Sequence, residues 1–171
     1  MEKGKPYIDK DIPIEKQVKY LRDKFSSQAV RTYKFFRREF GNRADELYER
    51  LYNMYMENTI KDYNLDLHNL PFSTVVAMAA NEEDKSLGFR PEVIHMSSEE
   101  VHTKFSSCPY HEAAQRLNFH EPVCTFVCEL NTKYMSEHSP YRADLTAKIA
   151  EGDDYCVMKI VKKGEQSQAK T

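Results

Sequence analysis

The chain has 171 residues, with 25 Lys or Arg against 27 Asp or Glu and a formal net charge of −2 at pH 7. A length of this order is typical of one domain, which can bury a core without disulfides. The balanced charge excludes a strongly basic surface, so we expect no nucleic-acid partner. The N-terminus lacks the apolar segment of a signal peptide, and no apolar run reaches the roughly 18 residues of a membrane span. We therefore expect no membrane partner and a cytoplasmic location.

The domain organisation follows from the prolines near the start of the chain and the polar residues near its end. Residues 1–13 are expected to form an extended arm, because Pro6 and Pro13 oppose an early helix. A single α+β domain is expected over residues 14–163, and the polar residues 164–171 are expected to be a disordered tail.

Apolar residues at helical spacing predict two helices directly after the arm. The first begins at Ile14, with Pro13 at its entry. The second is expected to be capped by Ser26 or Ser27 and to end at Gly41.

Two further helices are predicted before the middle of the chain. One begins near Asn42 and carries Tyr48, Tyr52 and Tyr55 at helical spacing, which we interpret as a core or boundary stripe with hydroxyls reaching water. A shorter helix follows Pro71.

The second half of the chain changes to the alternating pattern of strands. Residues 92–96 and 101–105 form one predicted hairpin, and residues 142–150 and 155–162 form another, with Gly152 in its turn. N-terminal helices followed by these pairs predict an α+β fold with an antiparallel sheet of about four strands and helices packed on it.

All four cysteines lie in this second half, at Cys108, Cys124, Cys128 and Cys156. In a reducing compartment, clustered cysteines are more often catalytic or metal-binding than disulfide-bonded. Cys108-Pro109 is expected to begin a helix, and the helix dipole there favours a thiolate. Cys124 and Cys128 lie four positions apart on another predicted helix, opened by Pro122, and would share one face of it.

Three interpretations of the cysteines remain open at this point. Cys108 can be a catalytic nucleophile with His111 as its base. Alternatively, the four thiolates can hold zinc or another transition metal, although their spacing is not that of a zinc ribbon. The third interpretation is burial, because cysteine packs as a small apolar residue.

Several polar residues near the cysteines belong to the candidate site. Asp153 lies in the Gly-Asp-Asp turn, for which the turn interpretation is the stronger one. Arg142 is a candidate anchor for a substrate carboxylate, although most cations on strands point to solvent. His95 and His102 lie on the other hairpin and are uninformative individually.

Three motifs in order resemble one known family. They are Cys108-Pro-Tyr110, Cys124-Thr-Phe-Val-Cys128, and Ala150-Glu-Gly-Asp-Asp-Tyr-Cys156-Val-Met-Lys. Together they resemble the L-2-amino-thiazoline-4-carboxylic acid hydrolase-like family over roughly residues 20–162. The Gly-Asp-x-x-Cys ending is also similar, more distantly, to the 4-vinyl reductase type of small-molecule-binding domain, some members of which hold zinc with cysteines.

The resemblance implies a hydrolase that opens a C–N bond in a small cyclic amidine-like ring, and hence a small-molecule substrate. Water adds to a C=N carbon in such chemistry, so the site must activate a nucleophile and protonate nitrogen. The resemblance makes the four cysteines and Asp153 candidate site residues. Tyr110 and Asn131 are expected to lie beside the substrate. The family has an acidic residue where this chain has Asn131, which cannot act as a base, and Glu129 is a differently facing substitute.

A competing hypothesis is a non-catalytic module that binds a small molecule or a metal through the same cysteines. No other cofactor is expected. Aromatic stripes on the early helices would permit a homodimer, but they are equally explained as core.

Overall fold

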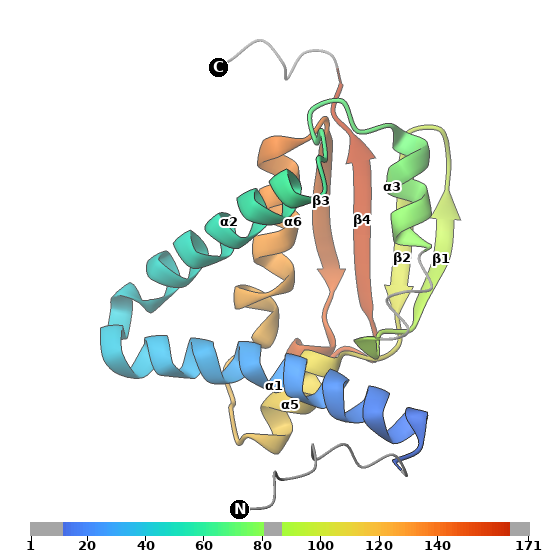
Figure 1. The fold of residues 1–171 in the computed structure, drawn as a ribbon. Helices are drawn as coiled ribbons and strands as arrows, with labels where there is room; N and C mark the ends of the chain where they lie inside the picture. The colour runs from blue at the N-terminus through green and yellow to red at the C-terminus, as the bar shows by residue number, and fades with distance from the viewer. Residues whose placement is uncertain (1–11, 81–86, 165–171) are drawn as a thin grey trace, which may run out of the picture.

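A computed structural model describes residues 12–80 and 87–164, so the predicted arm and tail lie almost entirely outside the described residues. The centre of the fold is a four-stranded antiparallel sheet in the order β1-β2-β4-β3 (Figure 1). Its strands are β1 (Pro91–Met96), β2 (Glu100–Phe105), β3 (Tyr141–Ala147) and β4 (Cys156–Lys162). The predicted α+β class and both predicted hairpins are confirmed.

Helices cover one face and one end of this sheet (Figure 1). They are α1 (Ile14–Phe40), α2 (Ala44–Asp62), α3 (Phe72–Ala79), α5 (Pro109–Arg116) and α6 (Cys128–His138), with short 3-10 turns η1 (Gly41–Arg43), η2 (Val123–Phe126) and η3 (Ile149–Glu151). The α3 helix packs on β2, α6 packs on β3, and α1 packs on α5. No helix in the described part of the chain is long and apolar enough to cross a membrane.

The prediction of two separate helices before Gly41 was wrong, because α1 runs unbroken through Ser26 and Ser27. Both serines are buried, and the Ser26 hydroxyl donates a hydrogen bond to the carbonyl of Arg22, one turn earlier, at 3.0 Å. A serine that bonds back along its own helix in this way has no need to act as a cap.

The prediction that one helix carries both Cys124 and Cys128 was also wrong. Cys124 belongs to η2, and the chain breaks at Val127 (φ −125°, ψ −77°) before α6 begins at Cys128. The two cysteines therefore do not share the face of one helix. Strand β3 was predicted to extend to Ala150 but ends at Ala147, and η3 begins at Ile149.

The core is divided into two clusters. One lies where α1, α2, α5 and η2 meet, and its centre is the ring of Tyr33 stacked on Phe126 at a centroid distance of 4.0 Å. The other lies between the sheet and α3, where Val101 and Ile160 belong to the same buried cluster as Val75. The first cluster fixes η2, and the second fixes the inner face of the sheet.

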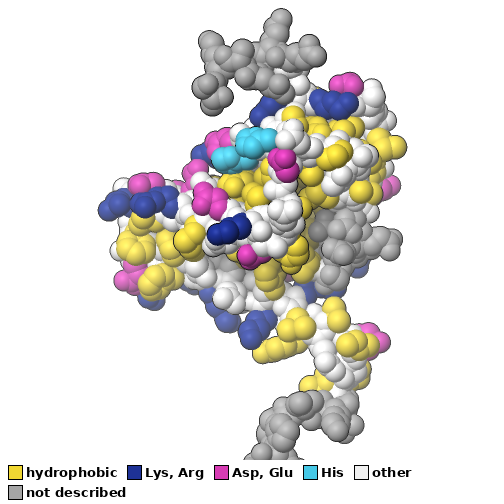
Figure 2. Space-filling view, turned by 45° about the horizontal axis from the view of Figure 1, so that its top comes forward, with side chains coloured by type: hydrophobic (Ala, Val, Ile, Leu, Met, Phe, Trp, Pro, Cys, Tyr) yellow, Lys and Arg dark blue, Asp and Glu magenta, His cyan; other side chains and the backbone are white. Residues whose placement is uncertain are grey.

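Some apolar side chains remain outside both clusters. Ile14, Leu21 and Phe25 on the first half of α1 are 65%, 62% and 51% exposed. Figure 2 shows hydrophobic side chains at the surface where the described chain begins. Their exposure is compatible with the predicted homodimer, which stays a prediction.

The register between β2 and β4 decides which residues meet at the end of the sheet. Phe105 is paired with Cys156, so the residues that follow β2 lie beside the start of β4. Cys108 comes three residues after Phe105, and the two distant cysteines are thereby brought to the same end of the sheet.

Candidate functional site

All four cysteines line one cavity of about 280 Å³ at this end of the sheet. Cys108, Cys124 and Cys156 are buried, Cys128 is half-buried, and all four are free thiols. The rest of the lining is largely aromatic or aliphatic and includes Phe25, Tyr52, Tyr55, Phe89, Phe105, Tyr110, Leu145 and Met158. Phe25 and Tyr55 are more than half exposed and mark the mouth.

Cys108 occupies the N-cap of α5, as its position before Pro109 predicts. Its sulfur accepts a hydrogen bond from the backbone N–H of His111 at 3.4 Å. Burial nevertheless raises the pKa of Cys108, because the loss of hydration outweighs that one hydrogen bond. The expectation that the helix start makes Cys108 a thiolate is therefore not supported by its surroundings.

Cys156 has the opposite electrostatic character. The Cys156 sulfur accepts the backbone N–H of Ile149 at 3.3 Å, and Cys124 lines the same cavity. Interaction with the Cys124 thiol is the largest influence on Cys156, and together with the Ile149 hydrogen bond it lowers the pKa of Cys156 to about 7 despite its burial. The pKa of Cys124 is raised, because it is the partner that keeps its proton.

The cysteines do not form a preassembled metal cage among the residues described. Three metal-ligating atoms within 4.8 Å of one another are found at one place in those residues, and no cysteine belongs to it. A tetrahedral zinc site brings its sulfurs closer than that, about 3.8 Å apart for Zn–S bonds near 2.3 Å. Burial and the nearby sulfurs of Cys108 and Cys156 also raise the pKa of Cys128.

His111 and Asp153 lie away from the cavity. The His111 ring nitrogen Nε2 lies 3.0 Å from the side-chain nitrogen of Gln115, and His111 is not a lining residue. Asp153 is exposed, and its carboxylate accepts the backbone N–H of Lys148 at 2.7 Å. The observed role of Asp153 is that of a turn residue.

Arg142 also lies outside the lining. Its guanidinium is 64% exposed and pairs with Asp144 at 2.9 Å. Lys148 is held by Glu129 and Glu151. Within the described part of the chain, no Lys, Arg or His lines the cavity.

Tyr110 and Asn131 line the cavity, and Tyr52 joins them. The hydroxyl of Tyr52 donates to the amide oxygen of Asn131 at 3.2 Å. Burial raises the pKa of both Tyr52 and Tyr110, so the two hydroxyls remain protonated donors at neutral pH. Glu129 does not line the cavity, so it does not take the place of an acid at Asn131.

Sequence reasoning missed the aromatic part of the site. Tyr52 and Tyr55 were interpreted as a core stripe, and Phe25 and Phe89 were not singled out. Helical periodicity assigns such residues to one face of a helix, but it does not distinguish a packed face from one that lines a cavity.

The fold and the cavity thus define an α+β domain with a thiol-lined pocket at one end of its sheet. A model of the L-2-amino-thiazoline-4-carboxylic acid hydrolase family matches residues 22–160, a range that contains all four cysteines. The chain belongs to this family, and the resemblance seen in the three motifs is confirmed.

Comparison with solved structures relates the fold to a second group. A trafficking protein particle complex subunit 3 from Naegleria fowleri, covalently bound to palmitic acid, is similar with a TM-score of 0.53 and 15% identity. The similarity covers 85% of this chain and 97% of that one. At this identity it shows a shared fold. The chain matches no curated protein.

Proposed function

We propose that the protein is a hydrolase that opens a C–N bond in a small cyclic amidine-like molecule, with Cys156 as the nucleophile. The observation that carries the proposal is the grouping of four free thiols in one cavity, where the Ile149 backbone N–H and the Cys124 thiol lower the pKa of Cys156. The thiolate is the reactive form of cysteine, and a pKa near the working pH gives both thiolate and nucleophilicity.

The expected chemistry has two stages. The Cys156 thiolate adds to the carbon of the C=N bond, and the ring nitrogen takes up a proton. That nitrogen leaves as the C–N bond breaks, and water then attacks the carbon bound to Cys156 and releases the thiolate. Tyr110 lines the same cavity, and its hydroxyl can donate a hydrogen bond to the reacting nitrogen, whereas the Tyr52 hydroxyl donates to Asn131. Cys156 replaces Cys108 as the first candidate because burial disfavours a thiolate at Cys108.

The lining also bears on the substrate. A carboxylate brought into an apolar cavity requires a charged or strongly hydrogen-bonding partner. Because the described lining offers no cationic side chain, we propose a ring without a carboxylate as the substrate rather than a carboxylated one. A cavity of about 280 Å³ lies at the small end of ligand pockets and suits a single ring.

The test compares hydrolysis of 2-amino-thiazoline and of 2-amino-thiazoline-4-carboxylate. Wild-type protein is expected to favour the ring without the carboxylate, and Cys156→Ser is expected to lose at least about 100-fold in rate. Arg142→Ala is the control, because its side chain lies outside the cavity. Full turnover by Cys156→Ser would exclude this nucleophile, and preference for the carboxylated ring would exclude the proposed substrate class.

The apolar lining favours a second candidate, a module that holds an acyl chain as a cysteine thioester without turnover. The structure from Naegleria fowleri is described as covalently bound to palmitic acid, and a free cysteine in this cavity can form a thioester. Incubation with palmitoyl-coenzyme A followed by intact-mass measurement tests this candidate. One added acyl group that is absent from a single Cys→Ser variant would support it, and an unchanged mass would exclude it.

A further inference from the structure

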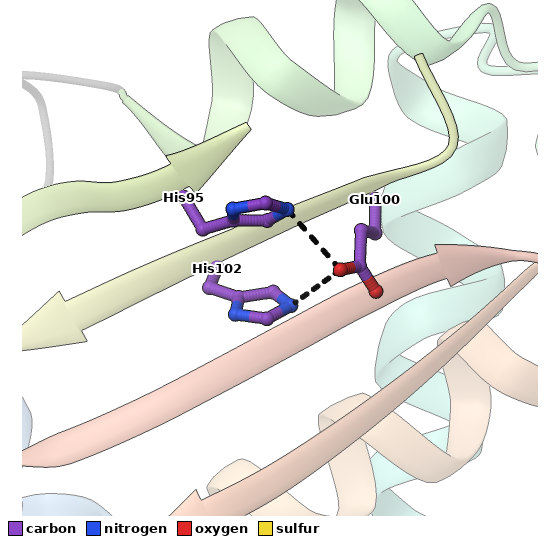
Figure 3. Close-up of side chains that lie close together, drawn as sticks. All are labelled: His95, Glu100 and His102. Carbon is purple, nitrogen blue, oxygen red and sulfur yellow. Dashed lines mark ion pairs between the residues drawn. The ribbon is translucent and has the colours of Figure 1, made fainter. Parts of the chain in front are cut away.

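Two histidines and a glutamate form a cluster on the face of the sheet opposite the cysteine cavity. The Nε2 atom of His95 lies 3.2 Å from Oε1 of Glu100, and Nε2 of His102 lies 3.4 Å from the same oxygen. Figure 3 shows both imidazole rings directed toward this carboxylate, His95 from β1 and His102 from β2.

A β-bulge creates this arrangement. The register between β1 and β2 shifts between Val93 and His95, so that His95 is paired with His102 directly across the ladder. An unshifted register would pair Ile94 with His102 and turn His95 to the other face. Bulges commonly re-aim a side chain in this way near functional sites.

The cluster leaves one nitrogen without a hydrogen bond. The Nε2 atom of His102 is buried and has no hydrogen-bond partner, although Oε1 of Glu100 is close. The other carboxylate oxygen of Glu100 is paired with the Lys159 ammonium at 2.8 Å. The Nε2 atom of His102 thus lies beside a carboxylate oxygen without a hydrogen bond of its own.

We propose that His95, Glu100 and His102 bind one divalent transition-metal ion, such as zinc. Two imidazole nitrogens and a carboxylate oxygen are a known zinc ligand set that leaves a fourth position for water. Bonds of 2.0–2.2 Å at tetrahedral angles place two ligand atoms about 3.4 Å apart. The observed nitrogen–oxygen separations of 3.2 and 3.4 Å match that spacing.

The site is open to solution and separate from the cavity. The side chains of His95, His102 and Glu100 are 48%, 23% and 26% exposed. Glu100 is paired with Val161 near the end of β4, whereas Cys156 begins that strand. A metal at this cluster therefore does not block the thiols, and the proposal stands apart from the hydrolase proposal.

The test is a titration of metal-free, full-length protein with cobalt chloride, followed by optical absorption. We expect one cobalt ion per chain with weak visible bands and without the intense sulfur-to-cobalt charge-transfer band of a thiolate site. Zinc chloride should displace the cobalt, and magnesium chloride should not, because imidazole ligands favour transition metals.

Variants decide whether the three residues are the ligands. His95→Ala and His102→Ala are each expected to weaken cobalt binding by at least about 10-fold. His120→Ala is the matched control, an exposed histidine outside the cluster. Should His102→Ala fold poorly, His95→Ala carries the test, because it is the more exposed of the two ligands. Unchanged binding by His95→Ala, absence of saturable binding, or a thiolate band would each overturn the proposal.

Discussion

The chemistry of the candidate site is set by differences between neighbouring thiols. Cys108 and Cys156 both accept a backbone N–H, yet burial raises the pKa of Cys108 while that of Cys156 is lowered. The deciding difference is the Cys124 thiol, whose interaction with Cys156 is the largest influence on the pKa of Cys156. A helix N-terminus alone therefore does not identify the reactive cysteine here.

This difference predicts how alkylation of Cys156 depends on pH. Thiolate forms as the pH rises through the pKa, so the rate with iodoacetamide should increase with a midpoint near the pKa of about 7 and then level off. Cys124→Ala removes the donor and should move the midpoint upward, whereas Cys124→Ser keeps a hydroxyl donor and should move it less. Peptide mapping by mass spectrometry reports the modified residue. An unshifted midpoint in Cys124→Ala would contradict the role of the thiol pair.

His111 provides a second prediction at the scale of one residue. Only its backbone N–H contacts the Cys108 sulfur, and its ring faces Gln115. His111→Ala keeps that backbone donor and should change the ring-opening rate by less than about two-fold. A large fall in rate, with a shifted pH profile, would restore His111 as the base.

At the scale of the element, η2 places Cys124 because Phe126 anchors it. The Phe126 side chain is 2% exposed and stacks on Tyr33 in the core. Cys124 and Cys128 stand on either side of this anchor, in different elements. A substitution that weakens the packing of Phe126 should therefore lower the stability of the fold and change the positions of the two thiols.

We expect Phe126→Ala to lower the free energy of unfolding by about 3–5 kcal/mol, because it removes a buried ring and leaves a cavity. Phe40→Ala is the control, since that side chain is 46% exposed at the end of α1 and should cost less than about 1 kcal/mol. Urea denaturation measures both. Equal losses in the two variants would show that Phe126 is not an anchor of the core.

The elements also show how far the sequence predicts the fold. The alternation of apolar and polar residues predicted both hairpins, and the Cys108-Pro109 dipeptide predicted the start of α5. The break at Val127 was not predicted, because apolar residues on both sides of it keep helical spacing while core packing of Phe126 decides the backbone.

The site was predictable only as far as its residues were close in sequence or distinctive in type. Cysteines are distinctive, so their grouping was anticipated, whereas the meeting of Phe89 with Tyr52 depends on tertiary packing. The His95 bulge left no sequence signal either, because an unshifted hairpin fits the same residues.

At the scale of the whole molecule, the fold is stabilised without covalent links between the described cysteines. All four are free, and two apolar clusters supply the core. We therefore expect the melting temperature, measured by circular dichroism, to be the same with and without dithiothreitol. A clear loss of stability on reduction would mean that a disulfide contributes to the folded state in solution.

The pairing of β2 with β4 has a kinetic consequence. These central neighbours join Phe105 to Cys156, residues that are far apart along the chain, whereas each hairpin joins nearby residues. Non-local contacts form late because a long loop must first be closed. Each hairpin can therefore assemble before the cavity exists, and the acidic thiol of Cys156 should emerge only in the last step of refolding. The reactivity of the Cys156 thiol would therefore report when the chain reaches its native structure.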